Sequence, residues 1–183
     1  MTLQISDAEL LVQFRTANRR DESYTILIRR YQERLYWHIR RIVIDHDDAN
    51  DILQNVFIKV WKNLDGFRED SQLFTWLYRI ATNESITFLN SKKKRFFIPI
   101  EDVTKELKYK LTTQGNFSEN KTELKLQEAI LKLPEKQRIV FNLRYYDEMP
   151  YDEMSRVLGT STGALKASFH HAVKKVEKFL LAD

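Results

Sequence analysis

The stretch PYDEMSRVLGTSTGALKASFHHAVKKVEKFL, residues 150–180, carries the clearest structural signals in the chain. Pro150 suits the start of a helix, because a first-turn residue has no helical partner for its N–H and proline has no N–H. Gly159 permits the left-handed backbone that ends many helices, and Ser161 is a good N-cap for a helix that follows. The stretch therefore predicts a helix, a tight turn and a second helix.

The second of these helices has two chemically different faces. An apolar stripe at helical spacing runs from Leu165 to Leu180 and is expected to pack inward. The opposite face combines cations with small side chains, which suits contacts to phosphates and base edges in the major groove of DNA. An ordinary amphipathic helix with a solvated basic side is the alternative. The candidate DNA contacts are Ser161, Lys166, Ala167, Ser168, His170, His171 and Lys174.

Three further helices are expected in the first half of the chain. Apolar residues recur every three or four positions over 24–43, 49–64 and 73–88, which is the period of an amphipathic helix. With Leu77 at the centre of the buried face of the third segment, Trp76 points outward. An outward tryptophan suits stacking on unpaired bases. A tryptophan packed against the preceding helix or loop is the alternative.

The composition favours an all-α protein. The 183 residues include only four glycines and three prolines, so turn-rich β architectures are disfavoured. No cysteine is present, which removes disulfides, thiolate nucleophiles and thiolate-bound metals. No uncharged run approaches the roughly 18 residues that a membrane helix needs. We expect a soluble intracellular protein without a membrane segment.

Positive charge is concentrated at one place. Residues 92–95 are all basic, and their four charges equal the formal net charge of +4 of the whole chain. This run suits contact with phosphates. A solvated edge of a linker explains it equally well. The helical period is then lost until about residue 120, apart from one possible short helix at 101–111. We therefore expect two small helical domains, 1–95 and 123–183, joined by a flexible linker over 96–122.

Three motifs resemble a known family and stand in that family's order. Leu133-Pro-Glu-Lys-Gln-Arg-Ile-Val-Phe, with the helix pair of 150–180, resembles region four of bacterial sigma factors of the extracytoplasmic-function group. Asp48-Ala-Asn-Asp-Ile-Leu-Gln-Asn-Val-Phe-Ile-Lys-Val-Trp and Phe74-Thr-Trp-Leu-Tyr-Arg-Ile-Ala-Thr-Asn resemble region two. The resemblance implies an alternative sigma factor, not an enzyme, that binds core RNA polymerase. It would melt the minus-ten promoter element with the first domain and recognise the minus-thirty-five element with the second.

The resemblance also implies partners and site residues. The exposed acceptors Asp51, Gln54 and Asn55 would dock on the beta-prime clamp of polymerase, and the beta flap would be a second contact. Further partners would be promoter DNA and an anti-sigma factor, in the cytoplasm at the nucleoid. Phe67 and Asn83 match positions that hold a base flipped out of the minus-ten element. The expected minus-ten contacts are Phe67, Trp76, Arg79, Asn83, Thr87, Lys92, Lys93, Lys94 and Arg95.

The second C-terminal helix departs from the family at two positions. It reads Ala164-Leu-Lys-Ala-Ser-Phe-His-His-Ala where Thr-Val-Lys-Ser-Arg-Leu-His-Arg-Ala is common, so Ser168 and His171 replace arginines. The loss of two guanidinium groups predicts a different or weaker minus-thirty-five preference.

Two other functions remain as alternatives. An enzyme would use Asp45-His-Asp-Asp as a metal or acid–base cluster, but consecutive residues point in different directions and no second ligand group stands at a productive spacing. We expect these acids to cap a helix, with His46 in a loop, and we expect no metal site and no cofactor. The second alternative is a helix-turn-helix regulator that binds duplex DNA without polymerase, usually as a dimer.

Overall fold

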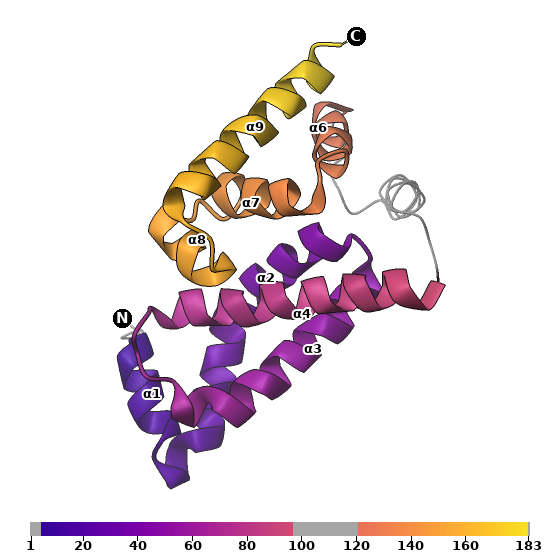
Figure 1. Ribbon diagram of the computed structural model, residues 1–183. Helices are drawn as coiled ribbons and strands as arrows, with labels where there is room; N and C mark the ends of the chain where they lie inside the picture. Colours follow the sequence, from indigo (N-terminus) through magenta and orange to yellow (C-terminus); the bar gives the residue numbers. More distant parts are fainter. Residues whose placement is uncertain (1–4, 97–120, 183) are drawn as a thin grey trace.

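The computed structural model describes residues 5–96 and 121–182, which form helices and connecting turns without a strand in these ranges (Figure 1). This confirms the prediction of an all-α fold. The expected helix at 101–111 and most of the expected linker lie outside the described residues. The first group of helices is α1 (Asp7–Phe14), η1 (Ala17–Arg19), α2 (Arg20–Val43), α3 (His46–Asn63), η2 (Leu64–Gly66) and α4 (Leu73–Phe96). The second is α6 (Lys121–Leu131), α7 (Glu135–Tyr145), α8 (Tyr151–Leu158) and α9 (Thr162–Leu180).

In the first group, α2, α3 and α4 pack on one another and α1 lies against α2. The apolar stripes predicted from the sequence form this core, and Leu35, Ile39 and Leu77 are completely buried. α2 begins at Arg20, about one turn earlier than the apolar period indicates. It ends at Val43, and the next residue, Ile44, has a left-handed backbone (φ 67°) at a position where glycine is common.

The second group confirms the helix, turn and helix predicted at 150–180. α8 follows Pro150, and Gly159 adopts the left-handed conformation (φ 62°) directly after it. The hydroxyl of Ser161 accepts the N–H of Ala164 at 3.4 Å and so caps α9. These signals act within a few residues of the chain, which is why the sequence alone was sufficient to place them.

The two groups of helices lie directly against each other. α8 packs on α4 and α7 contacts α2, as the stacked ribbons of Figure 1 show. One hydrophobic cluster runs through the contact and includes Leu77 and Ala81 of the first group with Leu143 and Met154 of the second. The second group also has a smaller core of its own between α6, α7 and α9. Of the helices in the described part of the chain, none is both long and apolar enough for a membrane span.

Candidate nucleic-acid and polymerase interface

A pocket of about 380 Å³ opens between the end of α3, the loop after η2 and the first turns of α4. The ring centroids of Phe67 and Trp76 lie 5.1 Å apart in its wall, with their planes tilted by 39°. Phe67 is 7% exposed, and Trp76 is half-buried. Trp76 therefore packs against the preceding loop with one part of its ring and borders an open cavity with another. The buried and the outward-facing interpretations of this tryptophan are each correct in part. The lining residues are Asn63, Gly66, Phe67, Arg68, Asp70, Ser71, Trp76 and Arg79.

The outer face of α4 continues from this pocket. Arg79, Asn83 and Thr87 are exposed, as expected with Leu77 at the centre of the buried face. Arg79 lines the pocket, whereas Asn83 does not. Asn83 lies about one turn, or about 6 Å, further along the helix. The structure thus provides an aromatic pocket followed by a row of polar side chains that can act as hydrogen-bond donors.

The basic run at the end of α4 is only partly described. The ammonium group of Lys92 lies 3.0 Å from the carboxylate of Asp48 on α3. It also lies 5.9 Å from the centre of the Phe88 ring. The side chains of residues 93–95 are outside the described ones. A phosphate that contacts Lys92 would have to compete with Asp48.

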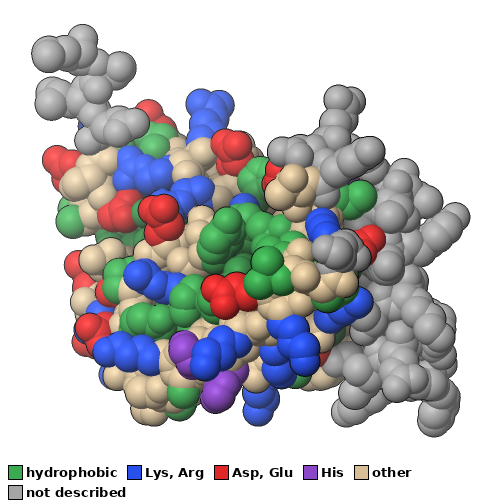
Figure 2. Space-filling view, turned by 90° about the horizontal axis from the view of Figure 1, so that it is seen from above, with side chains coloured by type: hydrophobic (Ala, Val, Ile, Leu, Met, Phe, Trp, Pro, Cys, Tyr) green, Lys and Arg blue, Asp and Glu red, His purple; other side chains and the backbone are tan. Residues whose placement is uncertain are grey.

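The face of α9 predicted to contact DNA is open to solvent. Lys166, Ala167, His170, His171 and Lys174 are exposed. Figure 2 shows histidine side chains beside a group of Lys and Arg side chains on one face of the molecule. Ser168 differs, because it is half-buried and lines a pocket of about 380 Å³ together with Ile86 of α4. The start of α9 thus lies beside α4 in this arrangement.

The outer face of α3 presents Asp51, Gln54 and Asn55, which are all exposed. Ile58 lies one turn further and is 52% exposed, so the face combines polar acceptors with an uncovered apolar side chain. A row of this kind suits a protein partner.

The Asp45–Asp48 segment is structural. Asp45 accepts the backbone N–H of Asp48 at 2.9 Å and caps α3, as predicted. The expectation that His46 lies in a loop is wrong, because His46 is the first residue of α3. It pairs with the hydroxyl of Tyr36 at 2.7 Å and the amide of Asn50 at 3.1 Å. Among the described residues, no group of three or more histidines and acids has a geometry that could hold a metal.

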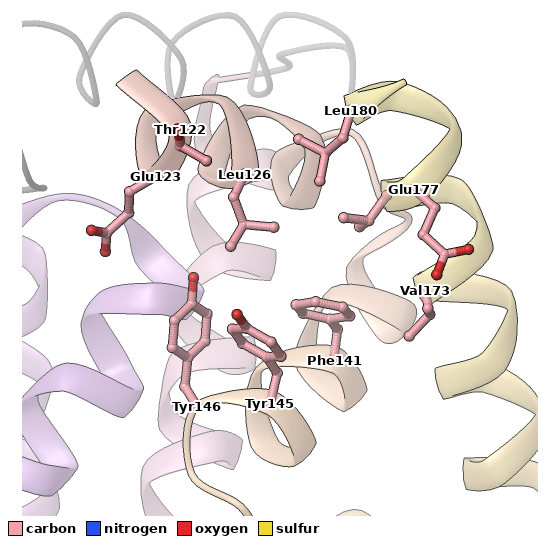
Figure 3. A pocket seen from close by; sticks show the side chains of 10 residues that line it. Thr122, Glu123, Leu126, Phe141, Tyr145, Tyr146, Val173, Glu177 and Leu180 are labelled. Carbon is pink, nitrogen blue, oxygen red and sulfur yellow. The ribbon is translucent and has the colours of Figure 1, made fainter. Parts of the chain in front are cut away.

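An apolar groove of about 490 Å³ lies between α6, α7 and α9. Figure 3 shows the rings of Phe141, Tyr145 and Tyr146 facing Leu126 across it. Burial raises the pKa of Tyr146 to about 12, so this hydroxyl stays neutral, and it accepts a hydrogen bond from Gln127 at 2.7 Å. Sequence reasoning missed the groove because three separate helices form it. The full lining is Thr122, Glu123, Leu126, Phe141, Tyr145, Tyr146, Val173, Val176, Glu177 and Leu180.

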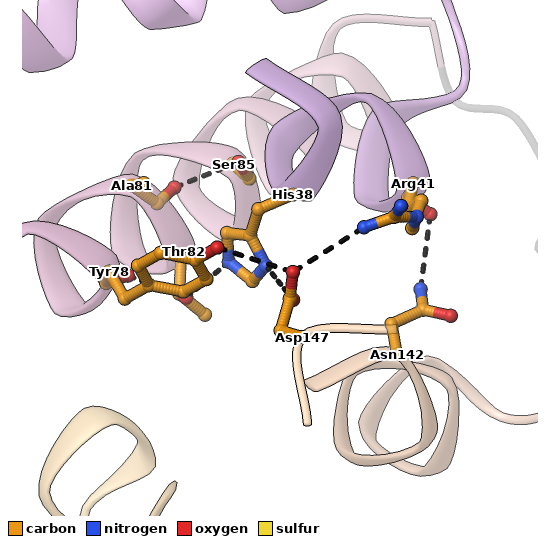
Figure 4. A network of polar contacts seen from close by, with 8 residues as sticks. All are labelled: His38, Arg41, Tyr78, Ala81, Thr82, Ser85, Asn142 and Asp147. Atoms are coloured by element: carbon orange, nitrogen blue, oxygen red, sulfur yellow. Dashed lines mark hydrogen bonds and ion pairs between the residues drawn. The ribbon is translucent and has the colours of Figure 1, made fainter. Parts of the chain in front are cut away.

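A second feature that sequence reasoning missed is a polar network between the two groups of helices (Figure 4). Asp147, in the turn between α7 and α8, is contacted by side chains of α2 and α4. Its carboxylate lies 3.2 Å from His38 Nδ1, 3.4 Å from Arg41 Nη1 and 3.2 Å from the hydroxyl of Tyr78. The other nitrogen of His38 lies 2.8 Å from the hydroxyl of Thr82. The packing of the two groups is therefore specified by buried polar contacts as well as by apolar ones.

Two family models match the chain, in the order of the two groups of helices. Sigma-70 region 2 matches residues 27–95, and Sigma-70 region 4 matches residues 123–176. The ECF RNA polymerase sigma factor SigW of Bacillus subtilis is 30% identical, over 87% of this chain and 89% of its own length. The ECF RNA polymerase sigma-E factor of Escherichia coli is 28% identical, over 97% and 95%.

Solved structures with the same fold include CnrH in complex with the cytosolic domain of CnrY. The match has a TM-score of 0.69 at 25% identity and covers 97% of this chain and 98% of that one. The sigma factor RpoE of Bartonella quintana, solved with the anti-sigma factor NepR, also has a TM-score of 0.69. It shares 18% identity and covers 88% of this chain and 99% of that one, so it shows the fold alone. Sigma factors are DNA-binding initiation factors and not enzymes, and these matches do not favour a regulator that works without polymerase. The chain belongs to the extracytoplasmic-function sigma factors of the sigma-70 family.

Proposed function

We propose a division of labour between two domains, 1–95 and 123–183, in the promoter-specific initiation that this sigma factor directs. The first domain docks α3 on the beta-prime clamp of core polymerase and opens the minus-ten element at α4. The second recognises the minus-thirty-five element with α9. The observation that carries this proposal is the Phe67–Trp76 pocket at the start of a row of exposed polar residues on α4.

The pocket gives a physical reason why the DNA strands can separate without a coupled energy-releasing reaction. Extruding a base from the duplex costs a few kcal/mol of stacking and pairing. Stacking of an unpaired base on an aromatic side chain contributes about 1 to 3 kcal/mol. Trp76 presents such a surface, and the guanidinium of Arg79 in the same lining can hold a phosphate or a base edge. Asn83, one turn along, donates to the next base in the row.

The groove between α6, α7 and α9 is assigned to the beta flap of polymerase. Its floor is apolar, and Glu123 and Glu177 stand in its lining. An amphipathic segment with an apolar ridge and flanking cations therefore fits it. We also propose an anti-sigma partner, which is supported by a solved fold relative that is bound to an anti-sigma factor. The protein would act in the cytoplasm, at the nucleoid.

Engagement of both promoter elements requires the two domains to separate. The elements lie about 25 base pairs apart by their names, which is about 85 Å along B-form DNA. In the packed arrangement, by contrast, Ile86 of α4 and Ser168 of α9 line one pocket. Residues 97–120 number 24, and a fully extended chain of that length reaches about 79 to 86 Å. This reach is comparable with the spacing of the two elements, so the length of the chain between the domains permits the separation.

Transcription with purified core polymerase on fragmented genomic DNA tests the proposal. We expect transcript starts that core polymerase alone does not produce, and mapping them identifies the promoters. On such a promoter, Trp76→Ala or Asn83→Ala should slow strand opening, measured by permanganate reactivity of unpaired thymines, more than it weakens core binding. Asp51→Arg should weaken core binding first.

Two results would contradict the proposal. The absence of promoter-specific starts would remove the function assigned to the chain as a whole. An equal loss of core affinity in all three variants would refute the division between α3 and α4.

A further inference from the structure

Two arginines at the N-terminal side of the chain hold the loop that lines the candidate minus-ten pocket. Arg15, directly after α1, donates from Nη2 to the carbonyl oxygen of Phe67 at 2.9 Å and from Nη1 to Glu69 at 3.0 Å. Arg20, at the start of α2, donates to Asp65 at 2.7 Å. Both arginines lie outside the region-2 match, which begins at residue 27.

The arginine contacts and the pocket involve the same short segment of the chain. The part of the lining that this segment supplies is Gly66, Phe67, Arg68, Asp70 and Ser71. Arg15 holds Phe67 through its carbonyl oxygen and Glu69 through its side chain, and Arg20 holds Asp65, which directly precedes Gly66. The arginine contacts therefore fall on a pocket residue or on its immediate neighbours in the chain, so a shift of these contacts would move the pocket wall.

The loop needs such support because part of its backbone is unfavourable. Glu69 has a φ of 61°, in the left-handed region that residues with a β carbon rarely adopt. The N–H of Phe67 bonds to the carbonyl of Leu64 at 3.1 Å, and its own carbonyl accepts from Arg15. Arg15 therefore completes the backbone hydrogen bonding of the residue whose ring forms the pocket wall with Trp76.

Arg20 is itself anchored on aromatic rings. Its guanidinium carbon lies 4.3 Å from the centre of the Phe14 ring and 4.9 Å from that of Trp61. The rings of Phe14 and Trp61 pack edge to face at 5.3 Å, which joins α1 to α3. The Arg20 side chain that contacts Asp65 is thus held by packed aromatic rings of the core.

We propose that Arg15 is a positioning residue for promoter opening. It holds Phe67 and the loop around it in the shape that encloses an unpaired base, and Arg20 supports the start of the same loop. This inference rests on the proposed role of the pocket. The side chains of Arg15 and Glu69 are 39% and 49% exposed, so their ion pair adds little to folding stability. A defect in opening can therefore be separated from a defect in folding.

The test compares Arg15→Ala with Arg19→Ala, which removes an exposed arginine of η1 and serves as the matched control. Each full-length variant is bound to core polymerase on a promoter mapped as described above. Core affinity, thermal melting of the free protein and the rate of permanganate-detected opening are measured. We expect Arg15→Ala to slow opening about five- to tenfold. Core affinity and melting temperature should match those of Arg19→Ala.

Two further measurements give results that a purely structural role would not produce. Base substitutions at the flipped position should be discriminated less strongly by Arg15→Ala, because a loosened pocket encloses every base less well. Arg15→Lys should open the promoter at an intermediate rate. The lysine side chain is shorter and ends in a single ammonium group, so it keeps only one of the contacts to Phe67 and Glu69. If Arg15→Ala lowers the melting temperature, the opening rate of Arg15→Lys is compared with that of wild type instead.

The outcomes distinguish this inference from the function on which it rests. If Trp76→Ala slows opening and Arg15→Ala behaves like Arg19→Ala, the positioning role is refuted and the pocket stands. If neither Trp76→Ala nor Arg15→Ala slows opening, the pocket assignment itself fails, and the positioning role with it.

Discussion

Replacing Asp147 with alanine is expected to loosen the packing of α7 and α8 against α2 and α4. The Asp147 side chain is 7% exposed and faces His38, Arg41 and the hydroxyl of Tyr78. Removal of one partner from a buried ion pair typically costs about 3 to 5 kcal/mol. The contacts of 3.2 to 3.4 Å are long, and the Arg41 side chain, 19% exposed, can reach water. We therefore expect the lower end, about 3 kcal/mol, or about a hundredfold shift in the docking equilibrium.

The absence of cysteine allows a direct assay. Single cysteines at the exposed positions Glu33 on α2 and Lys178 on α9 can carry a fluorophore pair, one dye in each group of helices. Energy transfer is followed through a urea titration, and far-UV circular dichroism reports helix unfolding in parallel. In the Asp147→Ala variant, the transfer should fall at lower urea while the helices remain folded. Asp147→Asn keeps the size and one acceptor oxygen, so it should lie between the alanine variant and wild type.

The neighbouring acid provides the control. Glu148 is exposed, and Glu148→Ala removes a carboxylate one residue away without touching the network of Figure 4. Apolar contacts such as Leu77 with the second group remain in every variant, so complete separation is not expected in water. If Asp147→Ala lost energy transfer at the same urea concentration as Glu148→Ala, the polar network would not contribute to docking and the reasoning would be wrong.

Three other predictions follow from single residues. Lys166→Ala should weaken promoter binding similarly across sequences and reduce the salt slope of the binding constant by about one, measured by titration at several salt concentrations. Gly159→Ala should destabilise the fold by about 1 kcal/mol, because the φ of Gly159 is 62°. Gly163→Ala in α9, where an added β carbon meets open space, should stabilise the fold by up to about 1 kcal/mol. Urea midpoints of the two variants that move in the same direction would contradict this pair of predictions. Burial, together with the neighbouring Asp147 carboxylate, raises the pKa of Tyr78 above its ordinary value of 10.0, so the folded state favours the neutral hydroxyl. The stability from this group is complete below pH 10 and is lost as the pH rises above it, so Tyr78→Phe should show a shallower alkaline fall in urea midpoint than wild type.

The described helices of the candidate site follow from local signals in the sequence. The phase of α4 was predicted with Leu77 inward, and Arg79 is exposed as that phase requires. The burial of one side of Trp76 was left open, because its partner Phe67 comes from a separate loop. The location of His46 was wrong because the helix begins one residue after its cap, Asp45. Propensity does not resolve helix ends to a single residue.

The polar network had one sequence signal that could have been used. α4 carries a second face of uncharged polar and aromatic residues at helical spacing, and Thr75, Tyr78, Thr82 and Ser85 on this face are all buried. Such a face, without Lys or Glu, is typical of contact with another part of the chain. Its partners, however, could not be named from the sequence.

Apolar period, caps and turn residues act over a few positions, so the amino-acid sequence was enough to predict α2, α3, α4 and the α8–turn–α9 unit around Gly159, whereas the short helix α1 (Asp7–Phe14) was not predicted. The contacts of Arg15 with Phe67 and of Asp147 with His38 were decided only by the tertiary structure. These pairs lie 52 and 109 residues apart in the chain. No periodic pattern links residues at such distances, since their meeting depends on how whole helices pack and on which buried polar groups find a partner.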